Sequence, residues 1–451
     1  MNLIKLKVMK LNNMKKTVLG LAVMAVGALN VNIVAGDERL ATEDYLGVEN
    51  YSEEDINEIY AHYELPEIIF AEDLLSEQGF STFAQEELIY TFGGEFIQNH
   101  ENALSQLSMI HSSFPQDRLG NIMLPAFYGG SYINYYGNLV VLLVNEFSHL
   151  NNLRVATATR VVNYSHDLLS RIMDYLFDIL MDESLDTSNI SYVWLDTINN
   201  KIVIALYEYH DDKTENFKRN LFDHSSLHFT ISAATPKPPE SPNYEMGSDL
   251  FERSTVVNPG TAISLTSGGT LDRSIGFRAR NRHNIWGFVT AAHQDGGSLR
   301  YHQRFFTGTR YVGSVTQVQL SGIDAAFVTL ANGLTMSSVA VDGSNTGIHS
   351  TNPVVGSMAT RISAGNTTSP LISSGIIRST NFIWDVNGQP ARAVRADNMF
   401  SLGGDSGGIV VHGSGGNFSI GGILVARFLD GSGSLYTAAP IINSVLALAT
   451  N

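Results

Sequence analysis

The last 196 residues of the chain, from Val256 onward, alternate short β-prone runs with turns rich in glycine, asparagine and serine. Helical periodicity returns only at Pro440–Ala449. Many short strands followed by one terminal helix predict an all-β fold, an antiparallel double β-barrel whose connecting loops carry the chemistry. The expected strands cover residues 274–280, 285–290, 310–318, 325–330, 357–362, 409–411 and 420–425.

One of the expected loops holds the segment Gly403–Gly408, which reads Gly-Gly-Asp-Ser-Gly-Gly. Small neighbours let a substrate backbone approach Ser406, and the N–H groups of such a turn can point at a developing oxyanion. We expect the N–H groups of Gly404 and Ser406 to do this. Because a serine hydroxyl is a weak nucleophile, it also needs a base and a third group that orients the base.

Candidates for both partners lie upstream, in Val289–His293 (Val-Thr-Ala-Ala-His) and Gly322–Ala326 (Gly-Ile-Asp-Ala-Ala). His293 and Asp324 are 31 residues apart, and Ser406 follows 82 residues later. The order His, Asp, Ser is that of chymotrypsin-like serine proteases and differs from subtilisin and the α/β-hydrolases. A Gly-Asp-Ser-Gly turn alone occurs in many β proteins, whereas three motifs in this order predict a catalytic triad.

The bulk composition restricts the alternatives. A chain of 451 residues is long enough for two or three domains, and its 44% hydrophobic and 16% charged residues suit folded ones. It contains no cysteine, which excludes disulfides and thiolate metal sites. The formal net charge of −16 argues against nucleic acid as a partner. The expected chemistry requires neither a metal nor a cofactor.

The charge is unevenly distributed. From Val256 onward there are 12 arginines and 8 aspartates, without lysine or glutamate, so this part carries about +4. Residues 1–255 therefore carry −20. Two segments of opposite sign can face each other, or each can simply keep itself soluble, and the sequence leaves both interpretations open.

Residues 1–36 have the pattern of an export signal, with lysines ahead of the apolar run Val18–Ala28. Met14 would serve equally well as a start. A single membrane anchor is the competing interpretation, but the run is short and interrupted by glycine and asparagine. We expect cleavage between Ala28 and Gly36 and release of the product outside the cell, without a stable membrane anchor.

Residues 37–231 predict an acidic α+β region without catalytic residues. Ser52 can cap an early helix, Ser131–Val144 and Ser191–Leu206 read as hairpins, and Asp167–Leu180 is an amphipathic helix capped by Ser165. The scattered histidines show no metal-ligand spacing: His62, His100, His111 and His149.

Residues 232–255 predict a linker with a processing site. Prolines 236, 238, 239 and 242 stand among serine, threonine, lysine and glutamate, a composition that stays exposed and open to cleavage. The expected plan is therefore a signal peptide (1–36), a pro region (37–231), this linker and a catalytic domain (256–451).

The catalytic domain resembles the bacterial branch of the chymotrypsin family, the alpha-lytic and Streptomyces griseus proteases. The resemblance covers nearly the whole of Val256–Asn451 and implies that Arg361 pairs with Asp405. Residues 128–133 and 193–196 resemble that family's pro region, which assists folding and then inhibits. Further matching segments are Ser274–Phe277, Gly287–His293, Val355–Gly356, Thr360–Arg361, Gly365–Thr368 and Gly375–Ile377.

The chain departs from the family pattern at several positions. Where relatives carry cysteines, this sequence has Arg273, Gln294 and Phe400. The serine that supports the catalytic aspartate is replaced by Val425, and a glycine that pairs with the substrate backbone is replaced by Arg427. Residues expected to line the primary specificity pocket are Phe400, Ser401, Leu424, Val425, Ala426 and Arg427.

The side chain of Arg427 has two possible consequences for specificity. If it points into the pocket, acidic residues are accepted before the scissile bond, because a buried guanidinium needs a carboxylate. If it points outward, small or medium apolar residues are expected, which is the version we favour from sequence.

The sequence therefore predicts a secreted serine endopeptidase made as a pre-pro-enzyme. It acts on protein or peptide substrates as a monomer, and its own pro region is its other partner. Two alternatives use the same scaffold: a protease-like binding protein, and an esterase or acyl transferase with the same triad.

Overall fold

The computed structural model describes residues 93–118, 122–144, 158–232, 234–238, 254–294, 297–363, 371–413 and 418–450. Every helix and strand in these ranges belongs to one compact unit. None of the described helices is long and apolar enough to cross a membrane. The expected signal segment and the helix expected after Ser52 lie outside the described residues.

The first barrel is built on a five-stranded antiparallel sheet in the order β11-β12-β17-β16-β15. A bridge between Ser264 and Phe306 links β15 to the β9–β10 pair, which curls the sheet toward closure. Its interior holds fully buried Phe288, Phe305 and Val328. The strands are β11 (Arg278–Arg280), β12 (Trp286–Thr290), β15 (Arg304–Thr307), β16 (Arg310–Gln319), β17 (Ala325–Leu330), and the short β8 (Val256–Val257), β9 (Ala262–Ile263), β10 (Arg273–Ser274), β13 (His293–Gln294), β14 (Gly297–Ser298) and β18 (Thr335–Met336).

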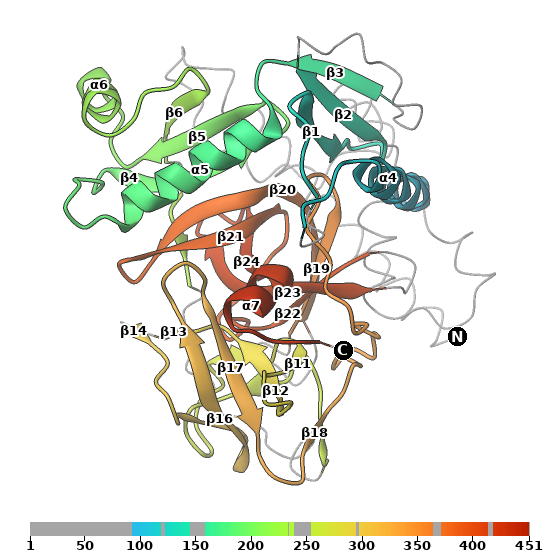
Figure 1. Ribbon diagram of the computed structural model, residues 1–451. Coiled ribbons are helices and arrows are strands. Elements are labelled where there is room, and N and C mark those ends of the chain that lie inside the picture. The colour runs from blue at the N-terminus through green and yellow to red at the C-terminus, as the bar shows by residue number, and fades with distance from the viewer. Residues whose placement is uncertain are drawn as a thin grey trace, which may run out of the picture. The chain divides into compact units, whose positions relative to one another are not determined.

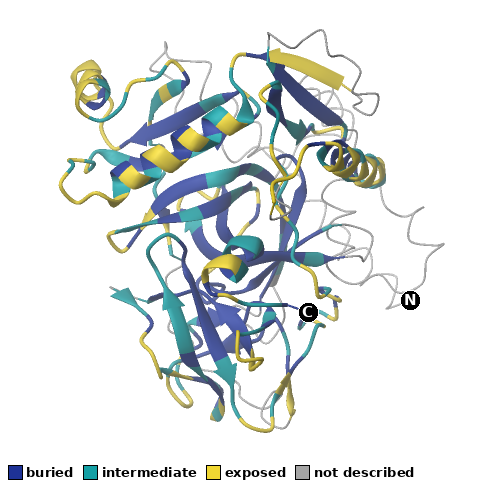
Figure 2. Ribbon diagram, in the orientation of Figure 1, coloured by how far each residue is buried: buried dark blue, intermediate teal, exposed yellow. Residues whose placement is uncertain are grey.

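The second barrel closes on itself. Six strands follow the order β19-β22-β23-β24-β21-β20, and β19 also pairs with β20. Closure leaves no open sheet edge and places most residues of these strands in the interior (Figures 1 and 2). The predicted double-barrel fold is therefore confirmed. The strands are β19 (Met358–Ser363), β20 (Leu371–Val386), β21 (Gln389–Asp397), β22 (Ile409–His412), β23 (Ser419–Phe428) and β24 (Gly433–Ala438).

The predicted terminal helix is present as α7 (Ala439–Val445) and is shorter than expected. The residues after it are drawn into a two-sided antiparallel bridge with β11. Arg280 N donates to Ala449 O at 2.7 Å, and Ala449 N donates to Arg280 O at 2.9 Å. This tertiary pairing ends the helix early, although its sequence pattern continues.

The long hairpin of β20 and β21 was missing from the list of expected strands. It turns at Asn387-Gly388, where both residues have positive φ angles of 53° and 82°. Such angles are those of a tight hairpin turn, for which Asn-Gly is the most favourable pair. The signal was therefore in the sequence, between two runs that mix polar and β-prone residues.

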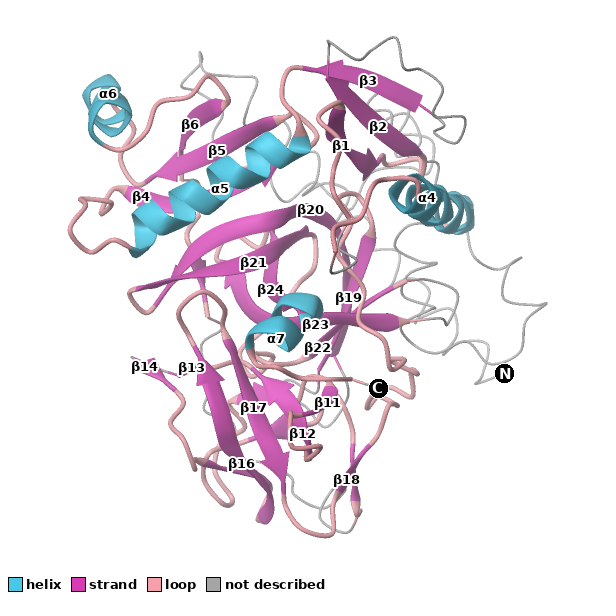
Figure 3. Cartoon of the chain, viewed as in Figure 1, coloured by secondary structure: helices cyan, strands magenta, loops and turns pink. Residues whose placement is uncertain are grey.

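The region before the linker has the expected α+β composition (Figure 3). The two predicted hairpins are β1–β2 and β4–β5, and the predicted helix is α5, whose cap Ser165 accepts a hydrogen bond from Leu168 N at 3.2 Å. The elements before the linker are α4 (Gly94–Ser112), β1 (Tyr128–Ile133), β2 (Leu139–Val144), β3 (Ala158–Val162), α5 (His166–Met181), β4 (Ile190–Asp196), β5 (Lys201–Leu206), α6 (Asp211–Asn220) and β6 (Leu227–Ile231), and β7 (Pro236–Lys237) lies in the linker itself.

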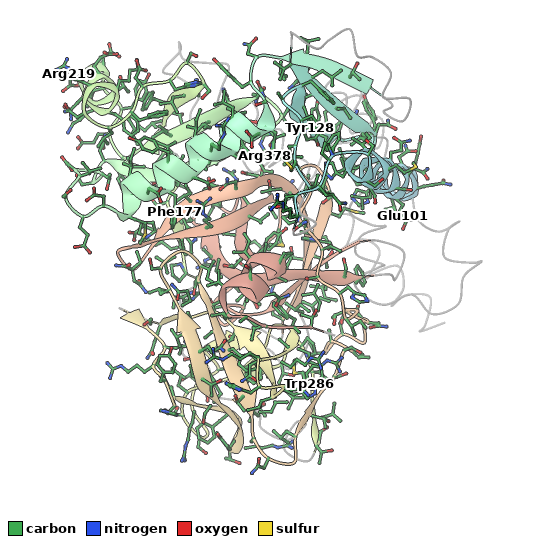
Figure 4. The ribbon with its side chains drawn as sticks, viewed as in Figure 1. Glu101, Tyr128, Phe177, Arg219, Trp286 and Arg378 are labelled. Carbon is green, nitrogen blue, oxygen red and sulfur yellow. The ribbon has the colours of Figure 1, made fainter. Side chains whose placement is uncertain are left out.

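A continuous sheet joins this region to the second barrel. Strand β4 pairs with β20 in antiparallel register, with Trp194 opposite Phe382. Beside this junction, Arg392 Nη2 lies 2.8 Å from Asp174 Oδ1, and the Arg392 guanidinium lies 4.5 Å from the ring centre of Phe177, labelled in Figure 4. At this point an aspartate from the acidic part of the chain pairs with an arginine from the basic part.

Ile383 tests how much this junction stabilises the chain. It belongs to β20, is 1% exposed and packs in a hydrophobic cluster with Leu169, Ile172 and Val193 of the preceding region. Ile383→Ala should lower the free energy of unfolding by about 2–5 kcal/mol in urea titrations, because it leaves a cavity at the junction. Ile285→Ala, at a residue that is 45% exposed, is the control and should change little. Equal effects of the two substitutions would show that the junction is not packed as described.

Candidate active site

The three predicted catalytic residues lie together, at strand ends of the two barrels. His293 begins β13, Asp324 directly precedes β17, and Ser406 lies in the turn before β22. His293 Nδ1 is 2.5 Å from Asp324 Oδ2, and His293 Nε2 is 2.9 Å from Ser406 Oγ. The imidazole therefore bridges the carboxylate and the hydroxyl.

Asp324 is fully buried, and backbone groups hold its carboxylate. Its Oδ1 accepts hydrogen bonds from the N–H groups of Ala292 at 2.7 Å and His293 at 2.9 Å. Val425 offers no hydroxyl, and the hydroxyl of Thr437 reaches only the backbone carbonyl of Asp324, at 3.5 Å. With Oδ2 facing Nδ1, the favoured imidazole tautomer carries its proton there and leaves Nε2 free to accept one from Ser406.

The backbone of the nucleophile turn is fixed by glycines and by Ser274. Gly404 and Gly407 have φ angles of +88° and +84°, a region that glycine adopts without strain. A Cβ at Gly407 would collide with the Thr290 hydroxyl. Ser274 donates from N to Ser406 O at 2.7 Å and from Oγ to Gly404 O at 2.9 Å. Among the described residues, no acceptor is bonded to the N–H groups of Gly404 and Ser406.

A buried ion pair lies directly under the turn. Arg361 Nη1 is 2.5 Å from Asp405 Oδ2, and both side chains are 0% exposed. Ser363 Oγ donates to Asp405 Oδ1 at 2.6 Å, and Leu402 N donates to Oδ2 at 2.7 Å. Complete burial lowers the pKa of Arg361, while the neighbouring carboxylate of Asp405 opposes that shift. Because Asp405 precedes Ser406, these contacts set the orientation of the nucleophile.

Arg273 supports the histidine, a role that sequence reasoning did not assign to it. Its side chain is 4% exposed, and its Nη1 donates to the carbonyls of Ala291 and His293 at 3.3 Å each. The guanidinium also lies 5.5 Å from the ring centre of Phe305. A cation thus ties the backbone around His293 at a position where relatives have a cysteine. The only signal in the sequence was that departure.

The residues expected to line a specificity pocket differ in how far their side chains are exposed. Leu424 is fully buried in a hydrophobic cluster with Met399 and Tyr436, so its side chain is part of the core. Its backbone instead holds the nucleophile turn, because Gly407 N donates to Leu424 O at 2.8 Å and Leu424 N donates to Gly408 O at 2.9 Å. The neighbouring Val425 and Ala426 are also 0% exposed.

The other three expected pocket residues are Phe400, Ser401 and Arg427, of which the last two have polar side chains. Phe400 is 50% exposed, whereas Ser401 is 1% exposed, with its hydroxyl 3.0 Å from that of Ser434. Arg427 Nη1 lies 3.5 Å from the carbonyl oxygen of Ser401. Strand β7 of the linker pairs antiparallel with β23 at the same place, with Lys237 opposite Arg427.

Metal-binding clusters are absent from the part of the chain that the structure describes. His100 is fully buried and accepts a hydrogen bond from Met358 N at 3.3 Å, so it is a packing residue. Burial lowers its pKa to about 4. His111 is half-buried beside the Tyr128 hydroxyl, while His62 and His149 lie outside the described residues.

Comparisons with known proteins bear on both parts of the chain. Residues 167–232 match the model of the Pro-like C-terminal domain family. No curated protein sequence matches the chain. Similar solved structures include the Nocardiopsis protease NAPase (22% identity, TM-score 0.35, 43% of this chain and 98% of that one), Cellulomonas bogoriensis chymotrypsin (23%, 0.34, 43% and 97%) and Thermobifida fusca protease A (22%, 0.35, 43% and 97%).

The ion pair under the nucleophile turn is expected to be essential for stability. Arg361→Met removes the cation and leaves a buried carboxylate, which should lower the free energy of unfolding by about 3–5 kcal/mol. Adding Asp405→Asn should restore part of that loss, because the unpaired charge is then gone. Urea titrations of the single and double variants measure the coupling. Arg282→Met, in an exposed turn, is the control. If Arg361→Met and Arg282→Met have the same free energy of unfolding, the ion pair does not stabilise the fold.

Proposed function

We propose that the chain is a secreted serine endopeptidase made as a pre-pro-enzyme. The single observation that carries this proposal is the line from Asp324 through His293 to Ser406, with separations of 2.5 Å and 2.9 Å. Gly404, two residues before Ser406, and Gly407, directly after it, leave room for a peptide backbone. The three residues lie in loops and at strand ends of the two barrels.

In the proposed mechanism, Ser406 Oγ attacks the scissile carbonyl while His293 Nε2 takes its proton. Asp324 holds the imidazole in the required tautomer and stabilises the imidazolium. The N–H groups of Gly404 and Ser406 receive the oxyanion, a contribution of about 2.7–4 kcal/mol per donor. His293 then protonates the leaving amine, and in the second half it activates the water that hydrolyses the acyl-enzyme.

We assign residues 37–255 the role of a pro region with its linker. Strand β4 extends the barrel sheet through β20, and the match of residues 167–232 to the Pro-like C-terminal domain supports the same assignment. Linker strand β7 lies on β23 as an extended peptide would. Residues 239–253 of the expected linker (232–255), which holds the processing site, lie outside the described residues. In this proposal the pro region covers the site until the linker is cut.

The covering is expected to be reversible. Lys237 lies directly opposite Arg427 in the antiparallel pair, and like charges at such positions destabilise pairing. The ion pairs at the junction, such as Arg392–Asp174, are partly exposed and therefore weak and sensitive to salt. Cleavage of the linker would thus remove the tether that keeps a weakly held strand on β23.

The first prediction of this proposal concerns the nucleophile. Ser406→Ala should abolish casein cleavage and leave the urea unfolding curve unchanged, because it removes one hydroxyl without opening a cavity. His293→Ala should lose comparable activity, since triad members act as a unit. Arg282→Met serves as the active control. Full activity of Ser406→Ala would refute the proposed mechanism, and hydrolysis of p-nitrophenyl acetate without casein cleavage would favour an esterase.

The second prediction is that residues 37–255 are needed to make the enzyme and not to run it. The double barrel pairs strands that are distant in sequence and should fold slowly. Residues 256–451 expressed alone should refold to active enzyme only when residues 37–255 are added in trans, and excess of that region should then inhibit casein cleavage. Unaided refolding to full activity, with no inhibition, would contradict the assignment.

A further inference from the structure

Arg427 is a cation beside the nucleophile turn without a carboxylate partner among the described residues. Its Nη1 has only the carbonyl of Ser401 at 3.5 Å, the outer limit of a hydrogen bond. Its Nε is buried and has no partner in the described part of the chain. A buried guanidinium N–H without an acceptor is costly, so a ligand that supplies one is favoured.

The Arg427 side chain is directed toward the backbone of Ser401, which is 1% exposed, and this differs from the outward orientation favoured from sequence. Two backbone hydrogen bonds attach β23 to the nucleophile turn at Leu424, three residues before Arg427. Arg427 stands opposite Ser434 in β24, and the Ser434 hydroxyl reaches the hydroxyl of Ser401 at 3.0 Å. Arg427 thus lies on the strand that holds the nucleophile turn, at the position where β7 pairs with that strand.

The guanidinium of Arg427 selects for a particular kind of side chain. A carboxylate can accept charge-assisted hydrogen bonds from it. A lysine or arginine of the substrate would instead be repelled by Arg427. An apolar side chain would leave the buried Nε without an acceptor, at a cost in binding. The site therefore fits an acidic residue best.

The distribution of glutamate gives an independent indication. All 21 glutamates of the chain lie at or before Glu252, whereas Val256–Asn451 contains none. That same segment keeps eight aspartates and twelve arginines. An endopeptidase meets its own copies continually, and a segment without the residue after which it cuts is spared. Lysine is also missing there, but Arg427 disfavours a cationic side chain, so glutamate remains.

We propose that the enzyme cleaves after glutamate, and that Arg427 is the residue that determines this specificity. The inference rests on the proposed function and names its substrate class. Arg427 binds the side-chain carboxylate and takes no part in bond making. Glu240, Glu245 and Glu252 all lie in the expected linker, so the enzyme can release itself by the same specificity.

The test compares matched peptide substrates that differ only in Glu or Gln before the scissile bond. The enzyme is the processed product obtained after expression of the full chain. We expect kcat/KM to be at least about 10-fold higher for the Glu peptide, as a charge-assisted hydrogen bond requires. Arg427→Met should lower kcat/KM for the Glu peptide about 10- to 100-fold and abolish the difference between the peptides, and Arg427→Lys should retain part of it.

Arg282→Met is the matched control, because it removes the same charge from an exposed turn and should leave the preference intact. Equal cleavage of the two peptides, or preferred cleavage after Leu, Lys or Asp in a peptide library, overturns the inference while the proposed function stands. Cleavage of no peptide at all refutes the proposed function itself. If Arg427→Met does not fold, the matched pair with the unaltered enzyme still decides. The N-terminus of the processed enzyme should follow a glutamate.

Discussion

The buried ion pair between Arg361 and Asp405 is the contact on which the rest of the site depends. It joins β19 of the second barrel to the turn that carries Ser406, and Ser363 Oγ and Leu402 N donate further hydrogen bonds to the carboxylate. The positive charge that pairs with Asp405 comes from Arg361, inside the second barrel. The turn therefore does not need the ammonium group of an N-terminus formed by cleavage as a partner for Asp405. The triad is assembled while the linker is still attached, and control in the proposed zymogen must come from covering the site.

Two buried arginines hold backbone segments of the site in this cysteine-free chain. Arg273 holds the carbonyls on either side of Ala292, next to the histidine, and Arg361 holds the turn of the serine. The contacts of both guanidinium groups depend on their burial. If the packing around them loosened, water would weaken the electrostatic interactions and the backbone segments would no longer be held in place. Closure of the second barrel and the strand pairing with β4 supply the surrounding rigidity.

Sequence reasoning predicted the parts of the fold that depend on local pattern. The double barrel, both early hairpins and α5 follow from periodicity and capping, and the grouping of His293, Asp324 and Ser406 was suggested by motif order. It missed features that only tertiary contacts decide: the early end of α7 at the Arg280–Ala449 bridge, and the side chain of Leu424, which joins the core. The backbone groups that hold Asp324 have no sequence signal at all, because every residue except proline supplies an N–H.

The most direct measurement of the central claim is the site at which a covalent inhibitor attaches. After incubation of the processed enzyme with a biotinylated fluorophosphonate, peptide mass spectrometry should find one adduct per chain, on Ser406. Prior alkylation of His293, the base 2.9 Å away, should prevent labelling. An adduct spread over several serines, or no adduct in an enzyme that still cleaves casein, would contradict the account.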